Sequence, residues 1–554
     1  MMKIRKVLGA GIAGAVSAFC FAAGKSLDVY YTLSLTEADF YVKWLLCSIL
    51  LSLVIYGIWT FAERKEKINI AAKKIVQKAS AFEGRLKGWM IALFLFLMWI
   101  PAWLSVFPGA FSYDAYDEWL QIHTGNITAH HPVLHVLLLG GLVEKIHGLT
   151  GSYNAGIAVY VFLQMAVLAA VFAYTVQFMR ERAVSPLWRL FAILFYAFSP
   201  VVQLFAICCT KDILFSAAFL LFAISLWRVC VSKETFFARK SWQILFCLSA
   251  LVSMIMRNNG FYAVVAMLVF LLPLCRRHFR RYFGILAVIG GLYALYVGPF
   301  YNMLQVTPGG MQEMLSVPLQ QLARVYHYEQ ETYTAEELQY LYTLIPQENW
   351  EQYRSTVADF VKSGFRQEVY KENPARFWKL WWQTGRKKPM TYLNSFLLGI
   401  VDYWYPFAVV DGYQDVYGAS SYFDYRVGPP GEEQIILPRL HAVYESISVD
   451  KDTQKLPGMF LLLSPGWYAL IYFQVLMYLW YRKQYRQIVP LLAILLYCAT
   501  LLLGPIALVR YVLILYYIFP VYCVFLPGKA EREQCRNGET DGRSNSRNAV
   551  LCQH

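Results

Sequence analysis

Residues 107–135 read FPGAFSYDAYDEWLQIHTGNITAHHPVLH and directly follow an apolar run at 89–106. Ionisable side chains are concentrated in this loop: Asp114, Asp117, Glu118, His123, His130, His131 and His135. Ionisable groups held against a lipid bilayer are costly, and they usually serve a pathway or a site. The loop therefore predicts a functional site beside the end of a membrane-crossing helix.

The composition indicates an all-α polytopic membrane protein. Of the 554 residues, 58% are hydrophobic and 16% are charged, with a mean hydropathy of +0.40, whereas charged residues make up about 25% of an ordinary soluble domain. Apolar runs of about 17–25 residues suit helices that cross a hydrocarbon core of about 30 Å. The runs that predict about twelve transmembrane helices lie near 7–24, 42–61, 89–106, 154–178, 190–207, 212–229, 242–256, 260–275, 283–302, 457–481, 488–505 and 508–527.

Basic residues set the predicted orientation of these helices. The formal charge of +14 could indicate nucleic-acid binding, but most Lys and Arg fall in short loops between apolar runs, as the positive-inside rule describes. The basic loops are 62–88, 180–189, 228–240, 276–281 and 482–486. Placing them all in the cytoplasm with both termini, as in a bacterial-type plasma membrane, satisfies the twelve-span count and argues against nucleic acid as a partner.

The predicted organisation has four parts. They are an N-terminal membrane domain (1–302) with the outer loop 107–153, an extracytoplasmic region with interfacial helices (303–456), C-terminal transmembrane helices (457–527) and a disordered cytoplasmic tail (528–554). None of the eleven cysteines lies between 304 and 456, so that region has neither a disulfide framework nor zinc-ligand spacing. The N-terminus resembles a signal peptide, but the many later runs favour an uncleaved first helix.

Two further apolar stretches are predicted to lie in the outer interface. Residues 132–146 are too short to span, and counting them would invert every later basic loop. Residues 392–410 are long enough, and a further span is the alternative, but they contain Asp402 and would also invert 482–486. Other helices are expected near 313–328, 334–343, 349–371 and 374–385, with irregular sequence at 408–435. The aromatic and basic segment 376–388, RFWKLWWQTGRKK, is typical of an interfacial helix.

Asp114 is the candidate catalytic residue. A carboxylate near the membrane surface could act as general base toward an acceptor hydroxyl, and its pKa would be raised by burial and lowered by nearby cations. The alternative for a single Asp is a helix N-cap or a solvated acid. Asp117, His130 and His131 are candidates for acceptor or phosphate contacts. Asp114 with those three residues could instead hold a divalent metal, the one cofactor that the loop suggests.

Basic residues mark three other ends of apolar runs. Lys211 with Asp212 could neutralise and orient a phosphate, although a helix-cap ion pair is the alternative. Arg257, followed by Asn258 and Asn259 in MRNNG, supplies a planar charge and neutral donors that suit a phosphate or sugar. Arg510 lies about a turn inside the last run and needs an anion partner or a wet cavity; snorkelling to the interface is the alternative for each cation.

The predicted orientation brings these groups to one side of the membrane. The loops or helix ends that hold Asp114, Lys211, Arg257 and Arg510 all emerge on the outer face. We therefore expect the four side chains to line one outward-opening cavity.

At this point the sequence resembles the GT-C class of polytopic membrane glycosyltransferases, which use a polyprenyl-phosphate-linked sugar. The matching features are an early outer loop with an Asp soon after a span, a His-Pro segment with a following helix (130–146), and a late large outer region. An uncharacterised bacterial GT-C-like family is similar in SYDAYDEW, HHPVLH, TKD, MRNNG, EMLSVPLQQLARVY (313–326) and DYWYP (402–406). The acidic motif is not a plain Asp-x-Asp or Asp-Glu pair, so a metal requirement does not carry over.

The resemblance implies an inverting sugar transfer from a polyprenyl-phosphate donor to an acceptor hydroxyl at the outer face of the cell envelope. Asp114 would act as base, Lys211, Arg257 and Arg510 would stabilise the leaving phosphate, and residues 303–456 would select the acceptor. Two other hypotheses remain. A transporter or flippase of a lipid-linked glycan would need charged residues near span centres, and a His-dependent membrane metalloenzyme would need a bound metal.

Overall fold

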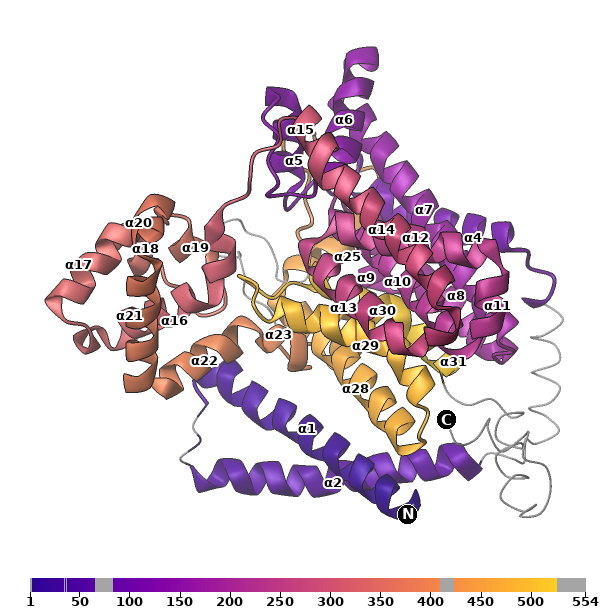
Figure 1. Ribbon diagram of the computed structural model, residues 1–554, viewed down its shortest axis with the longest axis horizontal. Coiled ribbons are helices and arrows are strands. Elements are labelled where there is room, and N and C mark those ends of the chain that lie inside the picture. Colours follow the sequence, from indigo (N-terminus) through magenta and orange to yellow (C-terminus); the bar gives the residue numbers. More distant parts are fainter. Residues whose placement is uncertain (1, 34, 36, 65–82, 409–422, 526–554) are drawn as a thin grey trace.

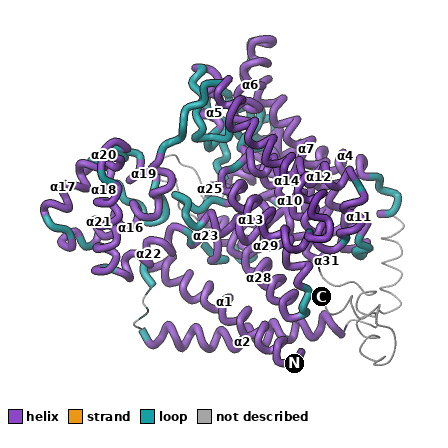
Figure 2. The backbone as a smooth tube through the Cα atoms, viewed as in Figure 1, coloured by secondary structure: helices purple, strands orange, loops and turns teal. Residues whose placement is uncertain are grey.

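The computed structural model describes residues 2–33, 35, 37–64, 83–408 and 423–525. Within these ranges the secondary structure is helical, and β-bridges occur only as isolated pairs (Figure 2). The prediction of an all-α protein is confirmed. The predicted disordered tail at 528–554 and most of the basic loop 62–88 lie outside the described residues.

Seven described helices are long and apolar enough to cross a membrane. They are α1 (Met2–Tyr30), α2 (Ala38–Arg64), α4 (Gly88–Ser105), α6 (Val133–Thr150), α7 (Tyr153–Glu181), α10 (Lys211–Val231) and the continuous stretch Arg276–Met303, which contains α14 (Phe279–Leu295) and α15 (Tyr301–Met303). An eighth arises if α8 (Pro186–Phe198) and α9 (Pro200–Ala206) form one span. These helices suit a multi-pass membrane protein.

Shorter apolar helices occupy most of the other predicted runs. They are α12 (Lys240–Met256), α13 (Asn258–Leu274), α29 (Tyr485–Leu501) and the broken helix Val509–Phe525, which contains α30 (Leu513–Ile518) and α31 (Tyr522–Phe525). The aromatic-rich helix α28 (Pro465–Tyr481) occupies the run at 457–481. Each has about 17 residues, at the lower limit for a span. The count of twelve spans therefore stays a prediction.

Three predicted elements differ from the structure. The stretch 132–146 was predicted to be too short to span, but α6 continues as a helix through Thr150 and reaches 18 residues, so the length argument was wrong. The run 190–207 bends by 54° between α8 and α9, at Ser199–Pro200, because proline cannot continue a helix's hydrogen bonding. The stretch 392–410 was predicted to be an interfacial helix, with a span as the alternative. Its described residues form two short helices, α22 (Pro389–Gly399) and α23 (Val401–Trp404), so the span-length helix of the alternative does not form.

The buried centre of the bundle is α10. Its sequence is apolar on all sides, as expected of a helix with no lipid-facing surface, and 89% of its most apolar 18-residue segment is buried. It packs against α7, α12, α29 and α30, so helices from the first and last thirds of the chain meet around it (Figure 1). Lys211 therefore begins the best-buried helix of the bundle.

A second body of short helices projects from the bundle (Figure 1). It contains α16 (Ser316–Tyr328), α17 (Ala335–Leu344), α18 (Gln347–Glu351), α19 (Asp359–Lys362), α20 (Gln367–Glu372) and α21 (Pro374–Lys387). We call residues 311–392 the cap, and they have a hydrophobic core of their own. The predicted helix 349–371 is broken into α18, α19 and α20, because residues 353–358 leave the helix to make tertiary contacts.

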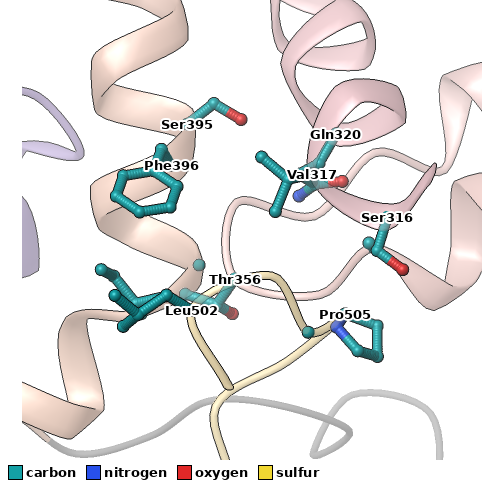
Figure 3. Close-up of a pocket in the computed structure, with 12 residues that line it drawn as sticks. Ser316, Val317, Gln320, Thr356, Ser395, Phe396, Leu502 and Pro505 are labelled. Carbon is teal, nitrogen blue, oxygen red and sulfur yellow. The ribbon is translucent and has the colours of Figure 1, made fainter. Parts of the chain in front are cut away.

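Those contacts join the cap to the C-terminal helices. Ala358 N–H donates to the carbonyl of Pro505 over 2.9 Å, and Val357 bridges Ile506. Figure 3 shows the crevice at this junction, a cavity of about 20 Å³ lined by residues of α16, α22 and the 502–505 loop. A cavity of this size holds about one water. The 502–508 loop leads directly into the 3-10 helix η5 (Val509–Val512), so the cap rests on the segment that carries Arg510.

Helices α1 and α2 form a hairpin along one edge of the bundle (Figure 1). A Cβ on Gly14 would lie 2.6 Å from the Ser52 backbone nitrogen and 2.8 Å from its Cα. A Cβ on Gly11, one turn away, would meet nothing within 4 Å. Small residues that allow such close approach are typical of helix pairs in membranes.

We predict that Gly14→Ala pushes α1 and α2 apart and destabilises the protein by about 1–3 kcal/mol. Thermal unfolding of the detergent-solubilised protein measures the effect. Gly11→Ala is the matched control on the same helix and should unfold at the same temperature as the wild type. Equal melting of both variants would contradict the packing described here.

Candidate functional site

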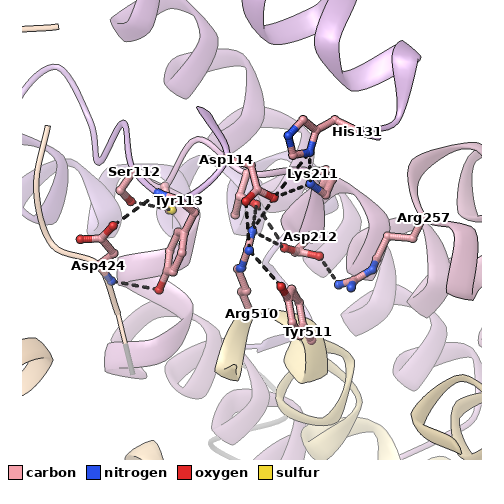
Figure 4. Close-up of polar contacts among 12 residues, drawn as sticks. Ser112, Tyr113, Asp114, His131, Lys211, Asp212, Arg257, Asp424, Arg510 and Tyr511 are labelled. Atoms are coloured by element: carbon pink, nitrogen blue, oxygen red, sulfur yellow. Dashed lines mark hydrogen bonds and ion pairs between the residues drawn. The ribbon is translucent and has the colours of Figure 1, made fainter. Parts of the chain in front are cut away.

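Three of the predicted site residues meet at one point (Figure 4). Asp114 directly precedes α5 (Ala115–Thr124), Lys211 begins α10, and Arg510 lies in η5. Lys211 Nζ donates to Asp114 Oδ2 over 2.5 Å. Arg510 donates from Nη1 to Oδ2 over 2.9 Å and from Nη2 to Oδ1 over 3.2 Å. Asp114 is thus held by two cations from distant parts of the chain, and its side chain keeps 23% of its surface exposed.

A second carboxylate, Asp212, continues the cluster inward. It is fully buried, and it accepts hydrogen bonds from Arg257, from Thr210 Oγ1 at 3.1 Å and from Arg510 Nη1 at 3.4 Å. Arg510 therefore bridges the two aspartates, and Arg257 closes the far end. The alternative for Lys211 and Asp212, a helix-cap ion pair between them, does not form, because Lys211 bonds to Asp114 and Asp212 bonds to Arg257 and Arg510.

Aromatic rings fix the direction of Arg510. Its guanidinium carbon lies 4.6 Å from the ring centre of Tyr113 and 4.7 Å from that of Tyr511, and Nη2 donates to the Tyr511 hydroxyl over 3.0 Å. Tyr113 has a left-handed backbone, with φ 55°, which is unfavourable for a bulky residue. Its hydroxyl accepts a hydrogen bond from Asp424 N–H over 2.9 Å. The turn before Asp114 is therefore held by Arg510 on the Tyr113 ring and by Asp424 on its hydroxyl.

The cations determine the charge of Asp114. Burial favours the neutral acid, but the charges of Arg510 and Lys211 outweigh it and hold the pKa of Asp114 well below its usual range. Asp114 is therefore ionised at neutral pH. The N-cap alternative does not apply, because its side chain makes no capping hydrogen bond to α5.

His131 completes the outer side of the cluster. It is 5% exposed, and its Nδ1 accepts a hydrogen bond from Lys211 Nζ over 3.1 Å, because an ammonium can only donate. Burial, together with the Lys211 charge, lowers the pKa of His131 to about 4. The ring is therefore neutral at pH 7 and acts as an acceptor.

The arrangement does not suit a metal ion. Among the described residues, Asp114, Glu118 and His131 place one potential ligand atom each within 4.8 Å of one another. Lys211 Nζ lies at the centre of that triad, 2.5, 3.5 and 3.1 Å from the three side chains. An ammonium there already supplies the positive charge, and it would repel a second cation.

Four predicted residues lie outside the cluster. The side chains of Asp117, His130 and Asn258 are exposed, although the His130 ring packs against His131 with ring centres 4.6 Å apart. Asn259 donates to Thr500 Oγ1 over 2.9 Å and so joins α13 to α29. The metal set of Asp114, Asp117, His130 and His131 is therefore not assembled.

The structure adds Glu118, Tyr113 and Asp424 to the site. Glu118 is 1% exposed and contacts Lys211. The cluster contains Glu118 and not Asp117 because Glu118 is four residues after Asp114, and residues i and i+4 lie on the same face of a helix. Nothing in the sequence separates Asp424 from other loop acids, since its contact with Tyr113 joins segments 311 residues apart.

The fold and site define an all-helical protein with membrane-length apolar helices and a buried ionic cluster at their ends. Its family can be stated. The chain matches DUF6020, a family of unknown function, over residues 119–541 and belongs to it. The match includes Lys211, Asp212, Arg257 and Arg510 and begins just after Glu118. No curated protein and no solved structure matches the chain.

The position of Lys211 predicts that the purified protein binds no stoichiometric zinc or iron and keeps its melting temperature when a chelator is added. Elemental analysis and thermal unfolding with and without chelator test this. A stoichiometric metal that is present in the wild type and lost in His131→Gln would contradict it.

The lowered pKa of His131 predicts an acid-sensitive stability. The unfolded histidine binds a proton below about pH 6.5 but the buried ring does so only near pH 4, so stability rises with pH between these values, by about 3 kcal/mol at most. His131→Gln should flatten this part of the stability–pH curve, measured by thermal unfolding. His130→Gln, an exposed neighbour, is the control, and an equal effect of both variants would count against the assignment.

Proposed function

We propose that the protein is a membrane glycosyltransferase of GT-C type, in which Asp114 accepts the proton of an acceptor hydroxyl. The observation that carries the proposal is the pairing of one partly exposed, ionised carboxylate with Lys211 and Arg510 from two separate helices. An ionised carboxylate can accept a proton, and two preorganised cations can stabilise a phosphate that gains charge.

The proposed reaction is an inverting substitution. The acceptor oxygen attacks the anomeric carbon of the sugar, the bond from that carbon to the phosphate oxygen breaks, and its electron pair leaves with polyprenyl phosphate. The hydroxyl proton passes to Asp114. Lys211 and Arg510, which contact Asp114, stabilise the negative charge that the leaving phosphate gains. Arg257 lies farther from Asp114 and is bonded to Asp212.

Surface chemistry suits the site better than transport. The cluster is formed at the ends of apolar helices: Asp114 lies just past α4, Lys211 begins α10, and Arg257 lies between α12 and α13. Transport sites are instead expected near the middle of spans. In the proposed topology twelve spans cross a bacterial-type plasma membrane, both termini are cytoplasmic, and the cluster faces outward, where a cell-envelope acceptor is available.

In the proposed reaction the cap selects the acceptor. It projects from the bundle (Figure 1), and it contacts the loop that leads into Arg510 through Ala358 and Pro505. Binding of an acceptor to the cap would therefore act on the segment that carries a cation of the site. The interfacial position of residues 376–388 belongs to this proposal, and exposed Trp378 and Trp382 on α21 support it.

We predict that Asp114→Asn abolishes the transfer, lowering it by roughly 100-fold or more, since the amide cannot accept the proton. The measurement compares envelope glycans of cells that carry a deletion, the wild type or the variant. Asp117→Asn, an exposed acid three residues away, is the control and should restore the glycan that the deletion removes.

Membrane abundance of each variant must be measured beside the glycans, because Asp114→Asn leaves two cations less well paired. Asp114→Glu keeps the charge and provides a second comparison for folding. Full restoration of the glycan by Asp114→Asn would show that Asp114 is not the base.

A further inference from the structure

A buried chain of hydrogen bonds leads from Lys211 into the bundle. Glu118 on α5 faces Lys211 with Oε1 at 3.5 Å, and its Oε2 contacts Nδ1 of His135 on α6. The other ring nitrogen of His135, Nε2, lies 2.7 Å from the hydroxyl of Tyr160 on α7. That hydroxyl lies 3.0 Å from Gln164 Oε1. All four side chains are at most 4% exposed.

The far end of this hydrogen-bond chain fixes the hydrogen positions as far as His135 Nε2. The Gln164 amide group faces the carbonyls of Ala206 and Cys208, at 3.0 and 2.8 Å, and carbonyls only accept, so this end must be the NH₂ group. Its Oε1 can then only accept, which makes the Tyr160 hydroxyl its donor. The Tyr160 oxygen is left to accept, so His135 Nε2 must carry a hydrogen.

One more proton lies between Glu118 and His135. Their contact joins a carboxylate oxygen to Nδ1, and such a contact needs a hydrogen on one of the two atoms. The nearby ammonium of Lys211 favours the ionised carboxylate, and the pKa of Glu118, which burial would raise, is lowered by the His135 and Lys211 charges. The other titratable groups that interact with Glu118 are His131, Asp117, the Tyr160 hydroxyl and the thiol of Cys209.

We propose that Glu118 and His135 form a buried carboxylate–imidazolium pair, which positions Lys211 and leaves the cluster with one positive charge in excess. Because the pair is neutral as a whole, the cations Lys211, Arg257 and Arg510 have two other carboxylates bonded to them, Asp114 and Asp212. The exposed Asp117 interacts with Lys211 without a direct bond. One uncompensated charge suits a singly charged anion such as a phosphodiester. This step rests on the proposed function, since it describes the charge that the donor would meet.

The test is the protonation state of His135 in the unliganded, full-length protein. Nitrogen-15 NMR of protein labelled at its nine histidines distinguishes imidazolium from neutral rings. We expect one ring of the wild type to carry hydrogen on both nitrogens at pH 8, where histidines of ordinary pKa are neutral, and this needs no variant. His135→Gln should remove its signals, and Glu118→Gln should leave the same ring with one hydrogen.

Nine neutral rings under these conditions would overturn the pair, as would an imidazolium that survives in His135→Gln. Retention of the doubly protonated ring in Glu118→Gln would show that Glu118 is not its partner. His131→Gln is the matched control, and it should leave the persistent signal in place. The NMR result is independent of sugar transfer, so it can fail while Asp114 remains the base, and the reverse also holds.

Discussion

The ionic bridge from Asp114 through Arg510 to Asp212 is the constraint on which the site depends. Charges withdrawn from water are stable only when each is paired and hydrogen-bonded. Arg510 meets this need for both carboxylates at once, with Nη1 2.9 Å from Asp114 and 3.4 Å from Asp212. The bridge therefore ties the loop that ends at Asp114, the start of α10 and the 3-10 helix η5 into one unit, although 396 residues separate Asp114 from Arg510.

The residues that surround this ionic bridge hold its geometry. Tyr113 and Tyr511 confine the guanidinium between two rings, and Asp424 holds Tyr113 in its unfavourable backbone conformation. Such strain persists only where surrounding contacts over-determine it. Glu118 contacts Lys211, and His135 in turn contacts Glu118. The result is a carboxylate that stays ionised while most of its surface is covered.

The sequence predicts what is local and leaves open what is tertiary. Apolar length predicted helices such as α7 and α12 to within a few residues. Asp114, Lys211 and Arg510 could be predicted as site residues because they lie at run ends away from the basic loops. Glu118 could have been found from its four-residue spacing to Asp114. The break of the predicted helix 349–371 could not be found from the sequence, because residues 353–358 leave the helix to contact residues 505 and 506, which are distant in the sequence.

The low proton affinity of Asp114 is consistent with a role as base only if that affinity changes during the reaction. In the resting site Lys211 and Arg510 are bound to the carboxylate and hold its pKa down. A departing phosphate in the proposed reaction gains negative charge and competes for the same two cations. As they turn toward it, Asp114 loses its compensating charges and its pKa rises. Departure of the leaving group and acceptance of the proton are then coupled through shared cations, which explains why base and cations would be in direct contact.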